Sequence, residues 1–126
     1  MKTRYAVASA VAIGFGLGAI AVQSLHAQTK PLVYVVSENN PIDPVALKDY
    51  AAKQDVLIHK HGGKFIIQGG NPIALDGIPP KRFTVVVFDS MEKMQAWQNE
   101  PSQNELRAMR AKASNTISFA VEGIAN

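Results

Sequence analysis

Cysteine is absent from this chain of 126 residues. Without a thiol, the protein has no disulfide, no cysteine nucleophile and no N-terminal cysteine for lipid attachment. The N-terminus also lacks a twin arginine, which excludes Tat export. The folded part must therefore be stabilised by its own apolar core or by a partner subunit.

The chain also has little net charge once its N-terminus is set aside. The formal charge is +3, but removal of Lys2 and Arg4 with a leader leaves 11 basic residues against 10 acidic ones. A nearly neutral domain has no electrostatic footprint for nucleic acid or for an anionic membrane. We therefore expect no nucleic-acid partner, and no membrane association after cleavage of the leader.

Residues 1–27 have the layout of a secretory signal peptide. A short basic start is followed by an uncharged stretch over 5–22 and a more polar exit that ends at Ala27, the expected cleavage site. This predicts export to the periplasm or secretion. The alternative is an uncleaved N-terminal membrane anchor, because 18 uncharged residues are just long enough to cross a bilayer.

The remaining residues, 28–126, predict one domain of alternating strands and helices. Runs rich in β-branched and aromatic residues predict strands over 32–38, 64–68, 82–88 and 116–122. Apolar residues at helical spacing predict one helix capped by Asp43 and closed by Gly62 or Gly63, and another capped by Ser90. The second helix is interrupted at Pro101 and resumes over 102–113. A loop over 71–80 has room for a short edge strand over 73–75.

This β-α-β-β-α-β order predicts an α+β, ferredoxin-like fold with an antiparallel sheet and both helices on one face. Tyr34, Val36 and Glu38 are expected on the open face of the first strand. The last strand is expected to turn its small or polar residues, such as Ser118 and Ala120, to that open face. A mixed face in so small a domain favours covering by a second copy, hence a homodimer.

An ordered set of residues carries a family resemblance that spans residues 32–124. The set comprises Asp43-Pro44 with Tyr50, His61-Gly62-Gly63-Lys64-Phe65, Gly69-Gly70, the Arg82 strand, Trp97, Pro101, Arg110 and Val121-Glu122-Gly123. Together these residues resemble the domain-of-unknown-function family 1330, within the dimeric α+β-barrel superfamily. The resemblance implies a ferredoxin-like subunit whose sheet pairs with that of another subunit to form a barrel.

The resemblance implies no particular reaction. Superfamily relatives include small monooxygenases, isomerases and haem-handling proteins, whereas the family itself has no settled activity. This chain also departs from the pattern at two places: Val87 stands where an acidic residue is expected, and Pro101-Ser102-Gln103 replaces a proline-acid-tyrosine run. Both departures remove polar or aromatic groups near the ends of elements that border a cavity in such a barrel.

His61 and Arg82 are the candidate catalytic residues. Histidine titrates near neutral pH, so His61 is suited to proton transfer; its plain structural role would be to complement the helix C-terminus. The planar guanidinium of Arg82 is suited to a substrate carboxylate. Its structural alternative is a salt bridge to Asp76, to Glu122 or to a partner subunit.

Four further residues are candidates for ligand binding: Tyr34, Glu38, Trp97 and Glu122. Glu38 and Glu122 lie at strand ends and would form an acid/base pair if they faced one cavity; otherwise they are solvated rim residues. Trp97 would wall a pocket or, with Met91 and Met94, belong to the core. Tyr34 is either a polar group inside the barrel or part of the dimer packing.

The sequence predicts neither a metal site nor a cofactor. His59 and His61 are two residues apart, so on a helix they point to different faces, and no third nitrogen or sulfur ligand is near. The paired glycines lack the strand-loop-helix order and the Lys-Ser/Thr ending of a phosphate-binding loop. Two hypotheses remain: binding or cofactor-free conversion of a small organic molecule in a dimer cavity, or a non-enzymatic structural dimer whose barrel is filled by side chains.

Overall fold

A computed structural model describes residues 30–125, and the compact unit within them runs from Pro31 to Ile124. Its elements, in chain order, are β1 (Val33–Pro41), α2 (Pro44–Lys60), β2 (Lys64–Gly70), β3 (Arg82–Phe88), α3 (Met91–Gln98), α4 (Gln103–Ala113) and β4 (Ser114–Glu122). The predicted leader over residues 1–27 lies outside the described residues. None of the helices within 30–125 is long and apolar enough to cross a membrane.

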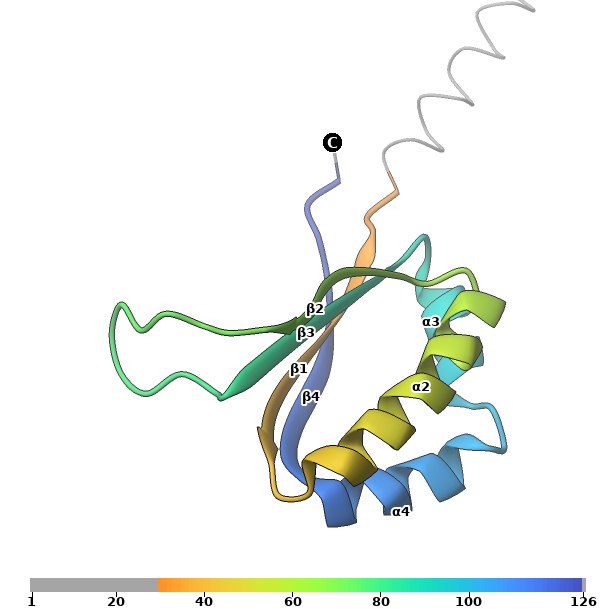
Figure 1. Cartoon of the computed structure of the whole chain (residues 1–126). Helices are drawn as coiled ribbons and strands as arrows, with labels where there is room; N and C mark the ends of the chain where they lie inside the picture. The colour runs from red at the N-terminus through yellow and green to blue at the C-terminus, as the bar shows by residue number, and fades with distance from the viewer. Residues whose placement is uncertain (1–29, 126) are drawn as a thin grey trace, which may run out of the picture. The chain divides into compact units, whose positions relative to one another are not determined.

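The four strands form one antiparallel sheet in the order β2-β3-β1-β4. The helices lie together on one side of this sheet and leave the other side without a helical layer (Figure 1). This arrangement confirms the predicted α+β, ferredoxin-like βαββαβ fold. The second helical segment is divided into α3 and α4 at Pro101, as the sequence predicted.

The predicted caps explain where the helices begin and end. The carboxylate of Asp43 accepts a hydrogen bond from the backbone N–H of Ala46 at 3.1 Å, which satisfies a free amide in the first turn of α2. That helix ends at Lys60 with His61 as its C-cap, and Gly62 continues the chain with a φ of +79°, a conformation that glycine adopts without strain. The hydroxyl of Ser90 caps α3 by accepting from the N–H of Lys93.

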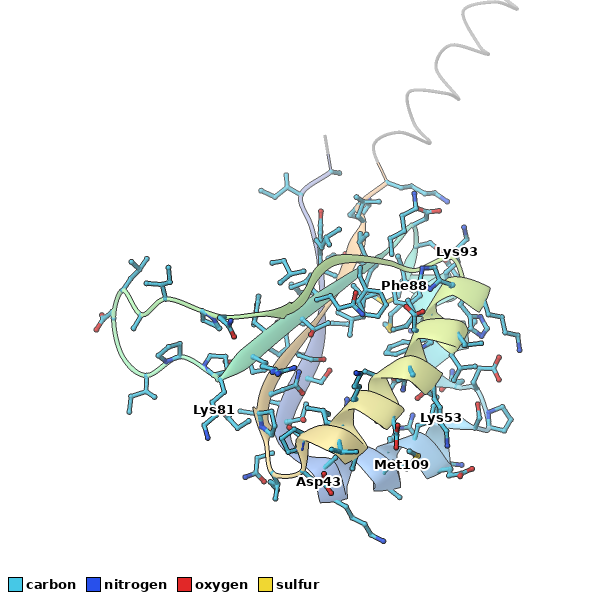
Figure 2. The ribbon with its side chains drawn as sticks, viewed as in Figure 1. Asp43, Lys53, Lys81, Phe88, Lys93 and Met109 are labelled. Atoms are coloured by element: carbon cyan, nitrogen blue, oxygen red, sulfur yellow. The ribbon has the colours of Figure 1, made fainter. Side chains whose placement is uncertain are left out.

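The apolar core lies between the sheet and the helices. Its buried members are Val33, Val35, Ile58, Val86, Phe88 and Trp97. Phe88 is fully buried and lies between the sheet and the helical layer (Figure 2), where its ring is 5.5 Å from that of Trp97. At the other end of the layer, Lys53 of α2 meets Met109 of α4, with Nζ 3.8 Å from Sδ (Figure 2).

Two strands are longer than predicted. β1 continues past Glu38 to Pro41, because β4 pairs with it over its whole length, up to the pair of Pro41 with Ser114. β2 continues through Gly70, with an irregular register against β3. The edge strand considered over 73–75 is not formed; residues 71–81 make a loop that projects beyond the sheet (Figure 1).

The prediction for the two faces of β4 was wrong. The register pairs Tyr34 with Val121 and Val36 with Phe119, so the large apolar residues of β4 lie on the open face. The pairing of Val35 with Ala120 places the small residues on the helix side instead. The physical reason is that the helical layer does not close over β4, so that small residues on its inner face border a pocket rather than core.

Candidate functional site

A pocket of about 310 Å³ lies between the sheet and the helical layer. Its floor comes from β1 and β4, and its walls come from α2, α3 and α4. The lining residues are Val35, Tyr50, Gln54, Met94, Trp97, Gln98, Gln103, Arg107, Arg110, Ser118, Phe119 and Ala120. Because Ser118 and Ala120 are small, the sheet leaves space here that larger residues would fill.

One wall of the pocket is a closed hydrogen-bonded network of buried side chains. The indole N–H of Trp97 donates to Oε1 of Gln54 at 3.0 Å, and Nε2 of Gln54 donates to Oε1 of Gln103 at 2.6 Å. Nε2 of Gln103 in turn donates to the backbone carbonyl of Trp97 at 3.1 Å. No buried side-chain nitrogen or oxygen within residues 30–125 lacks a partner, so this wall is a preformed, rigid surface.

A second wall carries two arginines of α4. Nη1 of Arg107 donates to Oδ1 of Asn104 at 3.0 Å, and Nη2 donates to the carbonyl of Gln98 at 2.9 Å. The guanidinium of Arg110 lies 5.8 Å from the ring centre of Tyr50 and donates to its hydroxyl at 3.4 Å. This cation–π and hydrogen-bonded pair joins α4 to α2 across the pocket.

The lining therefore combines apolar surface, amides, one phenol and two guanidinium groups. Among residues 30–125, no carboxylate, imidazole or thiol lines the pocket. Within the described residues, no group of three or more histidine, aspartate or glutamate side chains is arranged to hold a metal ion. The pocket is consequently equipped to bind and orient a small molecule, with Tyr50 as its one hydroxyl on an aromatic ring.

Of the residues proposed from the sequence, Trp97 alone lines this pocket. It also belongs to the core, where its ring lies 5.5 Å from that of Phe88. His61 lies at the C-terminus of α2, where its Nε2 is 2.8 Å from Oε1 of Glu100. The ammonium of Lys60 approaches the same oxygen at 2.7 Å. The hydrogen bonds from Lys60 and then His61 hold the pKa of Glu100 below its ordinary value.

The other candidates are dispersed over the sheet. Tyr34 and Glu38 lie on the open face, whereas Glu122 is paired with Val33 on the helix side. Glu38 and Glu122 are therefore on opposite faces and about 17 Å apart along the strands, at about 3.4 Å per residue. Arg82 begins β3 and forms none of the predicted salt bridges within the described residues.

The sequence reasoning missed most of the pocket. Tyr50, Gln54, Gln103, Arg107 and Arg110 all line it without having been proposed as site residues. Two of them, Tyr50 and Arg110, belong to the set that carries the family resemblance. Helical spacing gives a further signal, because it pairs each of these two with another lining residue. Tyr50 and Gln54 are four residues apart, and Arg107 and Arg110 are three apart, so each pair shares a helix face.

Solved structures with this fold support the architecture. The RPA0582 protein of unknown function from Rhodopseudomonas palustris is 14% identical, with a TM-score of 0.59, over 84% of this chain and 93% of that one. SnoaB, a cofactor-independent oxygenase from Streptomyces nogalater, is 9% identical with a TM-score of 0.55, over 77% and 96% of the two chains. A dimeric protein of unknown function and ferredoxin-like fold from Bacteroides fragilis is 12% identical with a TM-score of 0.50, over 73% and 96%.

At these identities the likeness establishes the fold and nothing finer. No curated protein matches the chain. The family model of the domain of unknown function DUF1330 matches residues 32–124, which include every helix and strand described above. The match confirms the resemblance found in the sequence, and the chain belongs to the DUF1330 family.

Proposed function

We propose that this protein binds a small organic molecule in the pocket between its sheet and its helices, and that it does so as a homodimer. The observation that carries the proposal is the pocket itself: about 310 Å³, with a floor of small residues and a wall of buried, fully paired amides. Pockets that bind small molecules are typically concave and largely preformed. This pocket shares both properties, and its lining is more polar than apolar. The ligand site thus lies inside one subunit.

The open face of the sheet supports the homodimer. Ile117, Phe119 and Val121 are 66%, 48% and 49% exposed, and they lie beside Val36 and Tyr34 of β1 on the face that α2, α3 and α4 leave open. Contiguous apolar patches of this kind are uncommon on monomers and typical of interfaces. A second copy is the proposed occupant because the fold neighbour from Bacteroides fragilis is described as dimeric.

The large side chains on the open face also fit the alternative of a structural dimer whose barrel is filled by side chains. Val87 stands on the open face, opposite Tyr34, where the family pattern has an acidic residue. With Phe119 and Tyr34 it would fill the space between two facing sheets. A side-chain-filled barrel is therefore compatible with our proposal, since the ligand pocket lies on the other side of the sheet.

Binding is proposed ahead of conversion for a chemical reason. The likeness to SnoaB, described as a cofactor-independent oxygenase, is a likeness of fold at 9% identity. The pocket lining holds no carboxylate or imidazole to act as a general base. Export by the leader over residues 1–27 remains part of the proposal; the mass of the purified protein tests it, with Gln28 as the expected first residue.

A library of small organic molecules, screened by thermal shift against the purified protein, tests the pocket. We expect hits that raise the melting temperature of the wild type and have no effect on Ala120→Leu, which places a larger side chain on the pocket floor. Ala111→Leu, on the exposed side of α4, is the matched control and should retain the hits. An absence of hits from chemically broad compounds, or hits that persist in Ala120→Leu, would contradict the proposal.

A further inference from the structure

The helix α4 presents one polar stripe to the pocket. Gln103, Arg107 and Arg110 are spaced by four and then three residues, so they lie on one face of the helix, and all three line the pocket. Gln103 is buried within the amide network, whereas the two arginines follow towards the middle and end of the helix. The stripe therefore brings two positive charges to one wall of a single small cavity.

Neither charge is paired with a carboxylate of residues 30–125. The acceptors of Arg107 are the Asn104 side-chain amide and the Gln98 carbonyl, and the acceptor of Arg110 is the hydroxyl of Tyr50. No carboxylate lines the pocket, and the ion pairs within residues 30–125 involve other basic residues. Guanidinium groups that lack an internal counter-ion in a hollow of one sign attract an anion from solution.

Three apolar side chains of β1 and α3 also line the pocket, together with the amides of Gln54 and Gln98. Val35 on the sheet and Met94 and Trp97 on α3 contribute hydrocarbon, thioether and indole surface. Tyr50 orients the guanidinium of Arg110 by stacking at 5.8 Å. A ligand that satisfies both the arginines and these apolar side chains therefore carries a negative group at one end and a flat apolar body at the other. With about 310 Å³ available, at the lower end of ligand pockets, one ring with a short substituent fits.

We propose that the ligand of this pocket is a small organic carboxylate with a planar apolar body, and that Arg107 and Arg110 recognise the carboxylate. This inference rests on the proposed function of the pocket. The fork of a guanidinium matches two carboxylate oxygens, which makes arginine well suited to this class. An inorganic anion would satisfy the arginines but would leave the apolar side chains of the pocket without a contact.

The single tryptophan of the chain makes this proposal measurable. Because the chain contains one tryptophan, and Trp97 lines the pocket, both its fluorescence and its single indole N–H resonance report on the site. We would titrate the purified protein with benzoate, with neutral benzamide of the same shape, and with inorganic phosphate. The variants are Arg107→Gln, Arg110→Gln and the double variant; Lys112→Gln, exposed near the end of the same helix, is the matched loss of one charge.

We expect benzoate to bind at least ten-fold more tightly than benzamide, and more weakly as salt is raised. Each arginine variant should reduce benzoate affinity about ten-fold or more while benzamide affinity changes little, and Lys112→Gln should behave as wild type. Equal binding of benzoate and benzamide, equal binding of phosphate, or a benzoate affinity unchanged in the double variant would overturn the proposal. If the carboxylate proposal fails in one of these ways, neutral library hits that bind the wild type but not Ala120→Leu would still support the small-molecule pocket. If no such neutral hits are found either, the proposed function is also contradicted.

Discussion

The indole nitrogen of Trp97 lies 3.0 Å from Oε1 of Gln54, and this hydrogen bond joins α3 to α2 beneath the pocket. Gln103 of α4 bonds to the same glutamine, so a single side chain ties the three helices together. Gln54 is 6% exposed and Gln103 is 2% exposed, which places the network where an unpaired polar group is costly. The wall of the site is thus also a structural joint.

Replacing Gln54 with alanine should destabilise the protein markedly. The substitution leaves the Trp97 N–H without its acceptor and Oε1 of Gln103 without its donor in a buried setting. Each unsatisfied group costs about 1–3 kcal/mol. We expect a loss of about 3 kcal/mol in the free energy of unfolding, measured by urea titration with Trp97 fluorescence. Gln95→Ala, on the exposed side of α3, is the control. Similar losses in the two variants would show that the network does not join the helices.

Acid should weaken the contact between Glu100 and the end of α2. Lys60 and His61 lower the pKa of Glu100 in the folded state, so its contribution to stability is present above the unfolded pKa and is lost as pH falls through the lower, folded value. That window begins near pH 4, the ordinary range of a glutamate. The Glu100→Gln variant should therefore lose less stability than the wild type between pH 5 and pH 3. The measurement is the urea midpoint of unfolding, taken at pH steps of about one unit.

The control for this acid effect is Glu105→Gln, on the exposed side of α4, which has no ion pair within the described residues. It should follow the acid profile of the wild type. A Glu100→Gln profile parallel to that of the wild type would mean that the Lys60 and His61 contacts contribute nothing to folding.

Gly63 should tolerate no side chain. A Cβ at this position would lie 2.7 Å from Cγ2 of Ile58 and 2.8 Å from the ring of Phe88, both in the core. We expect Gly63→Ala to cost about 2 kcal/mol through overpacking, by chemical denaturation. Gly70→Ala is the matched control, because its closest contact is a single side-chain carbon at 3.1 Å. If Gly70→Ala proved the more damaging of the two, the packing of the Gly63 turn would be misassigned.

A charge on the open face of β4 should separate the proposed dimer. Phe119→Glu buries a carboxylate in the proposed interface, where it has no partner of opposite charge among the apolar neighbours on that face. Light scattering should give half the wild-type mass at micromolar concentration. Val56→Glu, which changes an equally apolar but exposed residue of α2, should leave the dimer intact. A dimer that survives Phe119→Glu, or a wild type that is itself monomeric, contradicts the assembly.

Local chemistry made much of the fold predictable. Asp43 and Ser90 are helix N-caps, as the sequence predicted. The side chain of each accepts a hydrogen bond from the backbone N–H three residues later, so the cap depends only on nearby sequence. Strand alternation separated Ile117 from Ser118, but it does not say which set faces the helices. That choice depends on the register with β1 and on how far the helical layer reaches, and both are long-range properties.

The pocket was harder to foresee for the same reason. Tyr50 and Arg110 are 60 residues apart, and they meet only because α2 and α4 pack side by side. The family resemblance predicts a cavity inside a dimeric barrel, and the sequence therefore predicts ligand-binding residues on the open face, such as Tyr34 and Glu38. The structure has its pocket on the other face of the sheet, where α4 contributes a polar stripe that sequence periodicity indicates but does not locate.

The indole N–H resonance of Trp97 tests most directly whether this pocket holds a small organic molecule. Recorded by heteronuclear NMR during titration with each library hit, this resonance should shift and saturate in the wild type and stay in place in Ala120→Leu. If no compound shifts the resonance, or if it shifts equally when Ala120→Leu has filled the floor, the pocket does not hold the ligand.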